Sequence, residues 1–157
     1  VNTSLAAAGG VVACMIISKL TNSHTNIAAT LNGAIAGLVA ITAEPLTPTM
    51  GQAIIIGAIG GIICMYGMKL LDMLKIDDVV GAIPVHLFAG IWGTVAVGLF
   101  GASAGFDQFM VQLASTGIVG AFCVISTLII ALIVRKLMNI FPKERVRINL
   151  VGKSSNV

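Results

Sequence analysis

Charged side chains divide this chain of 157 residues into five long stretches that carry no charge. The stretches cover residues 1–18, 20–43, 45–68, 79–106 and 108–134. A helix that crosses the hydrocarbon core of a bilayer needs roughly 20 mostly apolar residues, within a range of about 17 to 25. Each stretch is therefore long enough for one membrane-spanning helix and holds no second one.

The composition is typical of a membrane protein. Apolar residues make up 57% of it and charged residues 10%, against about 25% charged residues in an ordinary soluble domain. This excludes a soluble enzyme and a disordered chain. The net charge of +3 does not indicate a nucleic-acid partner, because aromatic residues, which would have to be interleaved with the basic ones, are only 5%.

The stretches also lack the alternation of polar and apolar residues that marks the strands of a membrane barrel. We therefore predict an all-α membrane protein with five transmembrane helices. Their expected ranges are 2–19, 27–43, 50–71, 80–100 and 109–134.

The basic residues predict how these helices are oriented. With five spans the connections alternate between the two membrane faces, and all nine Lys and Arg fall on one face. Short cytoplasmic connections collect Lys and Arg. We therefore expect a plasma-membrane protein with the N-terminus of this chain outside the cell and its C-terminus in the cytoplasm. The basic residues are Lys19, Lys69, Lys75, Arg135, Lys136, Lys143, Arg145, Arg147 and Lys153.

Small residues indicate that the helices pack closely together. Gly33 and Gly37, and again Gly57 and Gly61, repeat at four-residue spacing, which lets helix backbones approach one another in lipid. The three cysteines, Cys14, Cys64 and Cys123, lie in three different spans without a CxxC pair. We interpret them as buried apolar residues, and we expect neither a metal site nor a cofactor.

His86 is the candidate functional residue, because it is the one ionisable His, Lys, Arg, Asp or Glu in the interior of any predicted span. It follows Asp78 by eight residues, which corresponds to about 12 Å of helix rise and places it near the middle of the membrane. Such residues usually face a cavity or a partner. Pro84 and the nearby glycines predict irregular backbone, which survives at this depth only in protein or beside a cavity. The alternative is a neutral His86 that only packs.

An apolar pathway with one imidazole suits a small neutral solute that forms hydrogen bonds. Removing water from an unpaired cation is too costly, whereas imidazole both donates and accepts. Asp77 and Asp78 stand at the start of the same helix. We interpret them as helix-capping carboxylates rather than as direct substrate ligands. His24 lies in a polar loop and is expected to be solvated.

Two segments carry a resemblance to a known family. The segment KIDDVVGAIPVHLFAGIWGTVAVG, residues 75–98, resembles the region around the second pore histidine of the ammonium transporters (the Amt/Mep/Rh superfamily). LNGAIAGLVAITA, residues 31–43, is similar to the helix two spans earlier, and VNTSLAAA at the start is similar to the beginning of the seventh helix. The similarity covers residues 1–136.

This resemblance implies a fold of eleven helices with two inverted five-helix repeats, of which the present chain supplies helices seven to eleven. It implies a homotrimer in which ammonium gives up a proton and ammonia crosses a hydrophobic pore past two histidines. His86 matches the pore histidine of the tenth helix, and Asp77 and Asp78 match the acidic pair at its cytoplasmic end. Trp92 matches a frequent tryptophan and is expected to pack. The first pore histidine belongs to a helix that this chain does not contain.

The sequence predicts two parts, a transmembrane region over residues 1–136 and a cytoplasmic tail over residues 137–157. The tail departs from the family pattern through which a PII-type regulator binds, and Arg145 and Arg147 are suited instead to anionic lipid headgroups. Leu87 and Phe88 also depart from the family, which often has glycine after the histidine.

Because the chain starts at Val1 rather than Met and its first apolar residues already belong to a predicted helix, we expect it to be a fragment of a longer protein, inactive by itself. Two alternatives to transport stay open. One is a sensor or interaction module on the same scaffold, and the other is a structural module in which His86 only packs. An enzyme is the least favoured reading, since the sequence shows no nucleophile, metal cluster or phosphate-binding loop.

Overall fold

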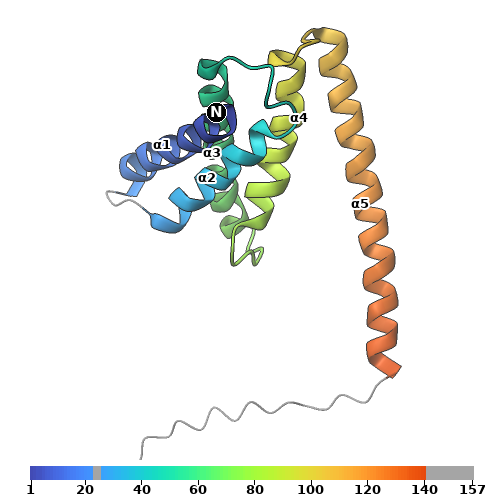
Figure 1. Cartoon of the computed structure of the whole chain (residues 1–157). Helices are drawn as coiled ribbons and strands as arrows, with labels where there is room; N and C mark the ends of the chain where they lie inside the picture. Colours follow the sequence, from blue (N-terminus) through green and yellow to red (C-terminus); the bar gives the residue numbers. More distant parts are fainter. Residues whose placement is uncertain (23–25, 141–157) are drawn as a thin grey trace, which may run out of the picture. The chain divides into compact units, whose positions relative to one another are not determined.

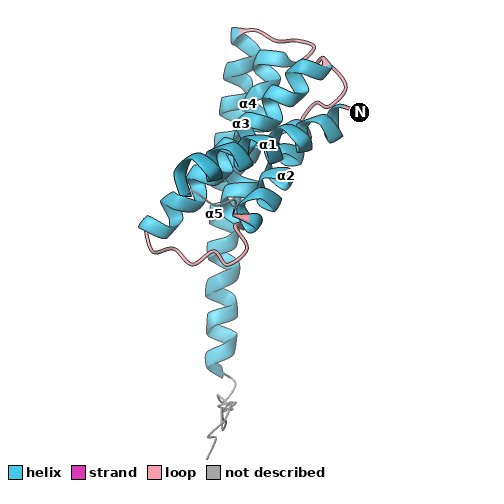
Figure 2. Cartoon of the chain, turned by 90° about the vertical axis from the view of Figure 1, so that its left-hand side faces the viewer, coloured by secondary structure: helices cyan, strands magenta, loops and turns pink. Residues whose placement is uncertain are grey.

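The computed structural model describes residues 1–22 and 26–140, and these residues form helices joined by short connections, without any strand (Figures 1 and 2). The all-α prediction is confirmed. The helices are α1 (Asn2–Asn22), α2 (Ile27–Ile41), α3 (Met50–Met73), the π-helix η1 (Ile83–Phe88), its continuation α4 (Ala89–Phe100) and α5 (Phe106–Ile140). His24 and residues 141–157 of the predicted tail lie outside the described residues.

The chain divides into two compact units, residues 1–118 and 119–157. The first unit holds α1 to α4 and the beginning of α5. In the second unit, the described side chains of α5 are nearly all exposed and mostly apolar. The prediction that all three cysteines are buried is therefore wrong for Cys123, which is exposed because it lies on this second part of α5, whereas Cys14 and Cys64 are buried.

Four helices within the described ranges are long and apolar enough to cross a membrane. They are Asn2–Thr21, Met50–Met73, Ile83–Phe100 and Phe106–Met138. The remaining helix, α2, has 15 residues, which corresponds to about 22 Å and falls short of a hydrocarbon core of about 30 Å. The second predicted span, over residues 27–43, is thus shorter than expected.

Both ends of α2 have a local cause. At its start, the Asn26 side chain accepts a hydrogen bond from the Ala29 N–H at 3.1 Å. At its end, the backbone N–H of Thr42 turns to the Val39 carbonyl at 3.2 Å. Pro45 follows three residues later, and the residue before a proline is unfavourable for helix, so the chain does not resume α2.

The ends of α3 are likewise built from neighbouring residues. Thr49 and Gln52 form a reciprocal capping box at the start. At the end, the Ile76 N–H bonds to the Leu71 carbonyl at 3.0 Å, and Lys75 adopts a left-handed φ of 56°. This is the hydrogen-bond pattern of a Schellman motif with lysine in place of the usual glycine. The helix therefore ends at Met73, two residues later than predicted.

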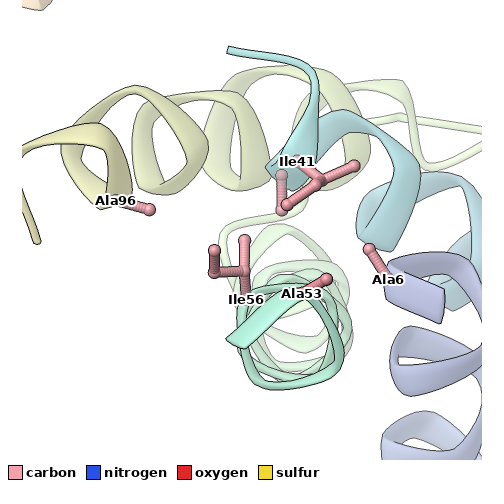
Figure 3. Close-up of a cluster of buried hydrophobic side chains, with 6 residues drawn as sticks. Ala6, Ile41, Ala53, Ile56 and Ala96 are labelled. Carbon is pink, nitrogen blue, oxygen red and sulfur yellow. The ribbon is translucent and has the colours of Figure 1, made fainter. Parts of the chain in front are cut away.

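The glycines on α2 and α3 hold these helices against α1, as their spacing predicted. A Cβ added to Gly37 or Gly57 would overlap the backbone of Ala6, and one added to Gly61 would lie 2.6 Å from the Gly10 carbonyl oxygen. Around this contact, small and β-branched side chains from α1 to α4 meet in the buried core (Figure 3). The core residues are Ala6, Ala40, Ile41, Ala53, Ile56 and Ala96.

Hydrogen bonds between the connections show that these alternate between the two ends of the bundle. The carboxylate of Glu44, after α2, accepts from the Ala102 N–H, after α4, at 3.0 Å. The Asn2 side chain, at the start of α1, donates to the Pro45 carbonyl at 3.1 Å, so the same end also holds the beginning of the chain. The segment between α3 and η1 lies instead beside the first half of α2, where the Asn32 side chain donates to the Val80 carbonyl.

Candidate functional site

His86 lies in η1, the segment of π-helix that precedes α4. The Ala89 N–H bonds to the carbonyl of Pro84, five residues earlier, which is the spacing of a π-helix. Pro84 has no N–H to donate and its ring crowds the carbonyl four residues before it, so a regular α-helix is unfavourable here. Single π-turns inside helices are often found at functional sites.

The two sides of η1 have different environments. Pro84 and Val85 are buried, and Val85 packs with Ala36 of α2 and Cys64 of α3. His86 and Leu87 are exposed. The imidazole therefore points away from the packed core of the first unit.

Phe88 is one of the two bulky residues that follow His86. The Phe88 ring is half-buried and lies against Gly67 of α3, where an added Cβ would come within 2.6 Å of the ring. It thus fills a notch on α3. Of the two bulky residues that follow His86, only Leu87 lies on the exposed side.

The carboxylate of Asp78 fixes the beginning of this helix. One oxygen accepts from the Ala82 N–H and the other from the Ile83 N–H, each at 2.9 Å. These N–H groups are among the first of the helix and have no partner within it. Asp77, its neighbour, is exposed, and its side chain has no hydrogen bond among the described residues. The structure brings only one of the acidic pair to the helix.

His86 lies nearer to the start of its helix than the sequence predicted. The helix begins at Ile83 rather than near residue 80, so His86 lies in its first turn, and the segment 79–81 is a turn. The turn lies beside the first half of α2, because the carbonyl of Val80 is bonded to Asn32, which lies five residues, or about 8 Å, into α2. The side chains of Val79 and Val80 are exposed. The helix rise that precedes His86 is therefore about three residues and not the eight predicted from Asp78.

Trp92 packs as expected. Its half-buried ring lies against the core, and its indole N–H donates to the Ile56 carbonyl of α3 at 3.0 Å. Asn32 is the residue that sequence reasoning missed. The available signal was that it is the one amide in the apolar sequence of α2.

A cavity of about 350 Å³ opens beside the segment that precedes η1. Its polar lining comes from Asn32, Asp72 and Asp78, and its apolar lining includes Pro84. His86 is not part of it. Across residues 1–22 and 26–140, no group of three His, Cys, Asp or Glu side chains is arranged to hold a metal ion.

The glycine-packed apolar helices and the irregular helix that carries a polar residue define the class of this protein. It is an integral, multi-pass membrane protein of the all-α type. Comparison with known proteins specifies the family: residues 1–150 match the Ammonium Transporter Family. The chain belongs to this family.

Individual relatives agree with this assignment. The chain is 50% identical over 99 residues to ammonium transporter Amt2 of Archaeoglobus fulgidus. The aligned segment covers 63% of this chain and 21% of that protein. It is 34% identical over 131 residues to ammonium transporter Amt1 of Haloferax mediterranei, covering 82% of the chain and 25% of the relative.

Solved structures share the fold as well. The crystal structure of Candida albicans Mep2 superposes with a TM-score of 0.74 at 31% identity, over 83% of this chain and 33% of that one. A structure described as a sensor Amt protein gives a TM-score of 0.68 at 32% identity, over 75% of this chain and 31% of that one. The chain spans between about a fifth and a third of the length of these relatives.

Proposed function

We propose that this chain is the C-terminal part of an ammonium transporter and that His86 lines its transport pathway. The observation that carries the proposal is the orientation of η1, which buries Pro84 and Val85 and leaves His86 exposed in a chain of the Ammonium Transporter Family. An imidazole in a membrane-spanning helix is unfavourable against lipid, so its exposed side calls for a polar partner or a solute. The remaining helices of the whole protein would supply the opposite wall.

The chemistry of this wall favours ammonia over an ion. The residues next to His86 on η1 are apolar, and an unpaired cation would lose its hydration without compensation. Imidazole donates through one ring nitrogen and accepts through the other, which suits a neutral solute that can do both. Potassium cannot release a proton to become neutral, so the same wall would exclude it.

The proposal extends to the whole protein. It would have eleven helices in two inverted repeats, of which α1 to α5 are the last five, and it would form a homotrimer with one pathway per subunit. The basic residues support an orientation with the start of α1 outside and the end of α5 in the cytoplasm. Contact of the tail with a PII-type regulator stays a prediction, because residues 141–157 lie outside the described part of the chain.

The test is uptake of methylammonium by the full-length protein carrying His86→Ala or His86→Leu. We expect transport or its selectivity against potassium to change, and Gly51→Ala on α3, where nothing lies within 4 Å of the added carbon, serves as the control. Unaltered uptake and selectivity in both His86 variants would remove the pathway role. The present chain alone, reconstituted in liposomes, should show no flux above control, because it provides one wall only.

A second candidate is an ammonium sensor built on the same scaffold, and the likeness to the sensor Amt protein supports it. The two candidates differ in flux. Normal ammonium signalling by a full-length protein that conducts no measurable ammonium would favour the sensor.

A further inference from the structure

Asn32 joins two elements that are distant in the sequence. Its amide nitrogen donates a hydrogen bond of 3.0 Å to the carbonyl of Val80, 48 residues later. The same nitrogen lies 3.9 Å from the sulfur of Met68 on α3. Asn32 thus stands where α2, α3 and the turn before η1 meet.

The Val80 carbonyl is the acceptor that Pro84 leaves without a donor. In an α-helix the N–H of each residue bonds to the carbonyl four residues earlier, which for Pro84 would be Val80. Proline has no N–H. The next candidate, the Val85 N–H, bonds to the Gly81 carbonyl at 3.2 Å instead. Asn32 supplies a donor for this carbonyl from another helix.

The amide also lies directly on the backbone of Gly81. A Cβ at this position would come within 2.5 Å of the Asn32 nitrogen. Gly81 has a φ of +74°, in the left-handed region that favours glycine. The turn can therefore approach α2 this closely only because residue 81 has no side chain.

Side chains of Asp78 and Asn32 both bond to the backbone where η1 begins, and their effects differ. The Asp78 carboxylate caps the first N–H groups but belongs to the same connection, so it stabilises the helix start without locating it in the bundle. Asn32 belongs to α2, which is packed against α1 and α3. Of these two contacts, the Asn32 hydrogen bond is the one that joins the turn to another helix. Val85 and Phe88 pack η1 itself against α2 and α3 further along.

We propose that Asn32 is a positioning residue for His86: by anchoring Val80 and Gly81 to α2, it sets where η1 begins and in which direction the imidazole points. This inference rests on the proposed transport function. His86 follows Gly81 by five residues and lies in the first turn of η1, so a displaced or rotated turn displaces the imidazole with it.

The experiment uses the full-length protein with Asn32→Leu, which fills a similar volume and removes the donor. The matched control is Thr30→Val, because Thr30 is half-buried on the same helix. Its hydroxyl donates at 2.9 Å to the backbone carbonyl of Asn26, four residues earlier, and so joins α2 to no other helix. Two properties are measured: methylammonium uptake per assembled protein, and the imidazole NMR resonance of His86, identified by its loss in His86→Gln.

We expect Asn32→Leu to lower uptake by at least about fivefold, the factor that corresponds to one net hydrogen bond, and to shift the His86 resonance. Thr30→Val should change neither. Retained uptake with an unmoved resonance would overturn the positioning role, and so would equal effects in the two variants. Asn32→Ser, too short to reach Val80, is the second variant. If both Asn32 variants fail to assemble while Thr30→Val assembles, Asn32 serves folding only and the inference is wrong.

These outcomes separate the inference from the function on which it rests. If His86→Ala leaves uptake unchanged, the pathway proposal fails, yet the resonance shift in Asn32→Leu still tests whether Asn32 positions the imidazole. If His86→Ala impairs uptake while Asn32→Leu changes neither property, the pathway stands and the positioning role is wrong.

Discussion

Helices α3 and η1–α4 lie in the same bundle and both contain glycines, yet they are built in different ways. α3 runs without interruption from Met50 to Met73, and both of its ends are closed by residues within a few positions. η1–α4 begins with a π-turn whose first groups depend on Asp78 and on Asn32 from another helix. α3 is thus built from local contacts and packs against α1, whereas the start of η1, which carries His86, depends on a residue of another helix.

The largest expected effect tests the packing role of α3. Gly57→Ala should destabilise the protein by about 1–3 kcal/mol or prevent assembly, because its new methyl group would overlap the backbone of Ala6. The matched control is Gly51→Ala on the same helix, where nothing lies within 4 Å of the added carbon. That change should be neutral or stabilising by up to about 1 kcal/mol.

Unfolding of the full-length variants in detergent, followed by heat or denaturant, measures the difference. Equal stability of Gly57→Ala and Gly51→Ala would contradict the close packing of α3 on α1.

A smaller effect tests the irregular start of η1. Asp78→Ala removes the acceptor of the Ala82 and Ile83 N–H groups and should cost about 0.5–2 kcal/mol, the usual value of a lost helix cap. It should also lower methylammonium uptake, since the His86 helix begins there. Asp77→Ala is the control, because Asp77 is exposed, and should stay within about 0.5 kcal/mol. If Asp77→Ala impaired uptake more than Asp78→Ala, the acidic pair would have a role other than capping.

The smallest expected effect concerns the far end of α4. There Glu44, in the connection after α2, accepts a hydrogen bond from the Ala102 N–H, in the connection after α4. Hydrogen bonds from Thr47 and from the Ala102 backbone lower the pKa of Glu44 below its usual value of 4.5. A lowered pKa in the folded state means that the charged carboxylate contributes stability above pH 4.5 and loses it as the pH falls through the folded pKa. The melting temperature of the protein should thus exceed that of Glu44→Gln at neutral pH, and the difference should shrink below about pH 4.5. A difference that is independent of pH would show that this carboxylate contributes nothing through its charge.

The sequence was sufficient to predict the helices, because gaps between charges and the length of a membrane span are both local quantities. Glycine spacing likewise predicted the close contact of α2 and α3 with a neighbouring helix. Helix ends were less accurate. Lys75 ends α3 in a left-handed conformation that lysine rarely adopts, and α2 stops at Ile41, two residues before its expected end.

The site was predicted only in part. His86 was recognisable because an imidazole is unusual in an apolar stretch, and Pro84 indicated irregular backbone. The partner of that irregular backbone was not recognisable, since Asn32 and Val80 are 48 residues apart and meet only through packing. The separate tasks of Asp77 and Asp78 also required the structure, because one carboxylate turns toward the helix and its neighbour turns to solvent.

The most direct test of the pathway role is an experimental structure of the full-length protein, at a resolution that shows ordered water. We predict that the exposed side of η1 faces the interior of the protein, with density for water or ammonia within about 2.7–3.2 Å of a His86 ring nitrogen. A lipid tail or a dry apolar contact against the imidazole, with no polar neighbour on either nitrogen, would contradict a transport pathway at His86.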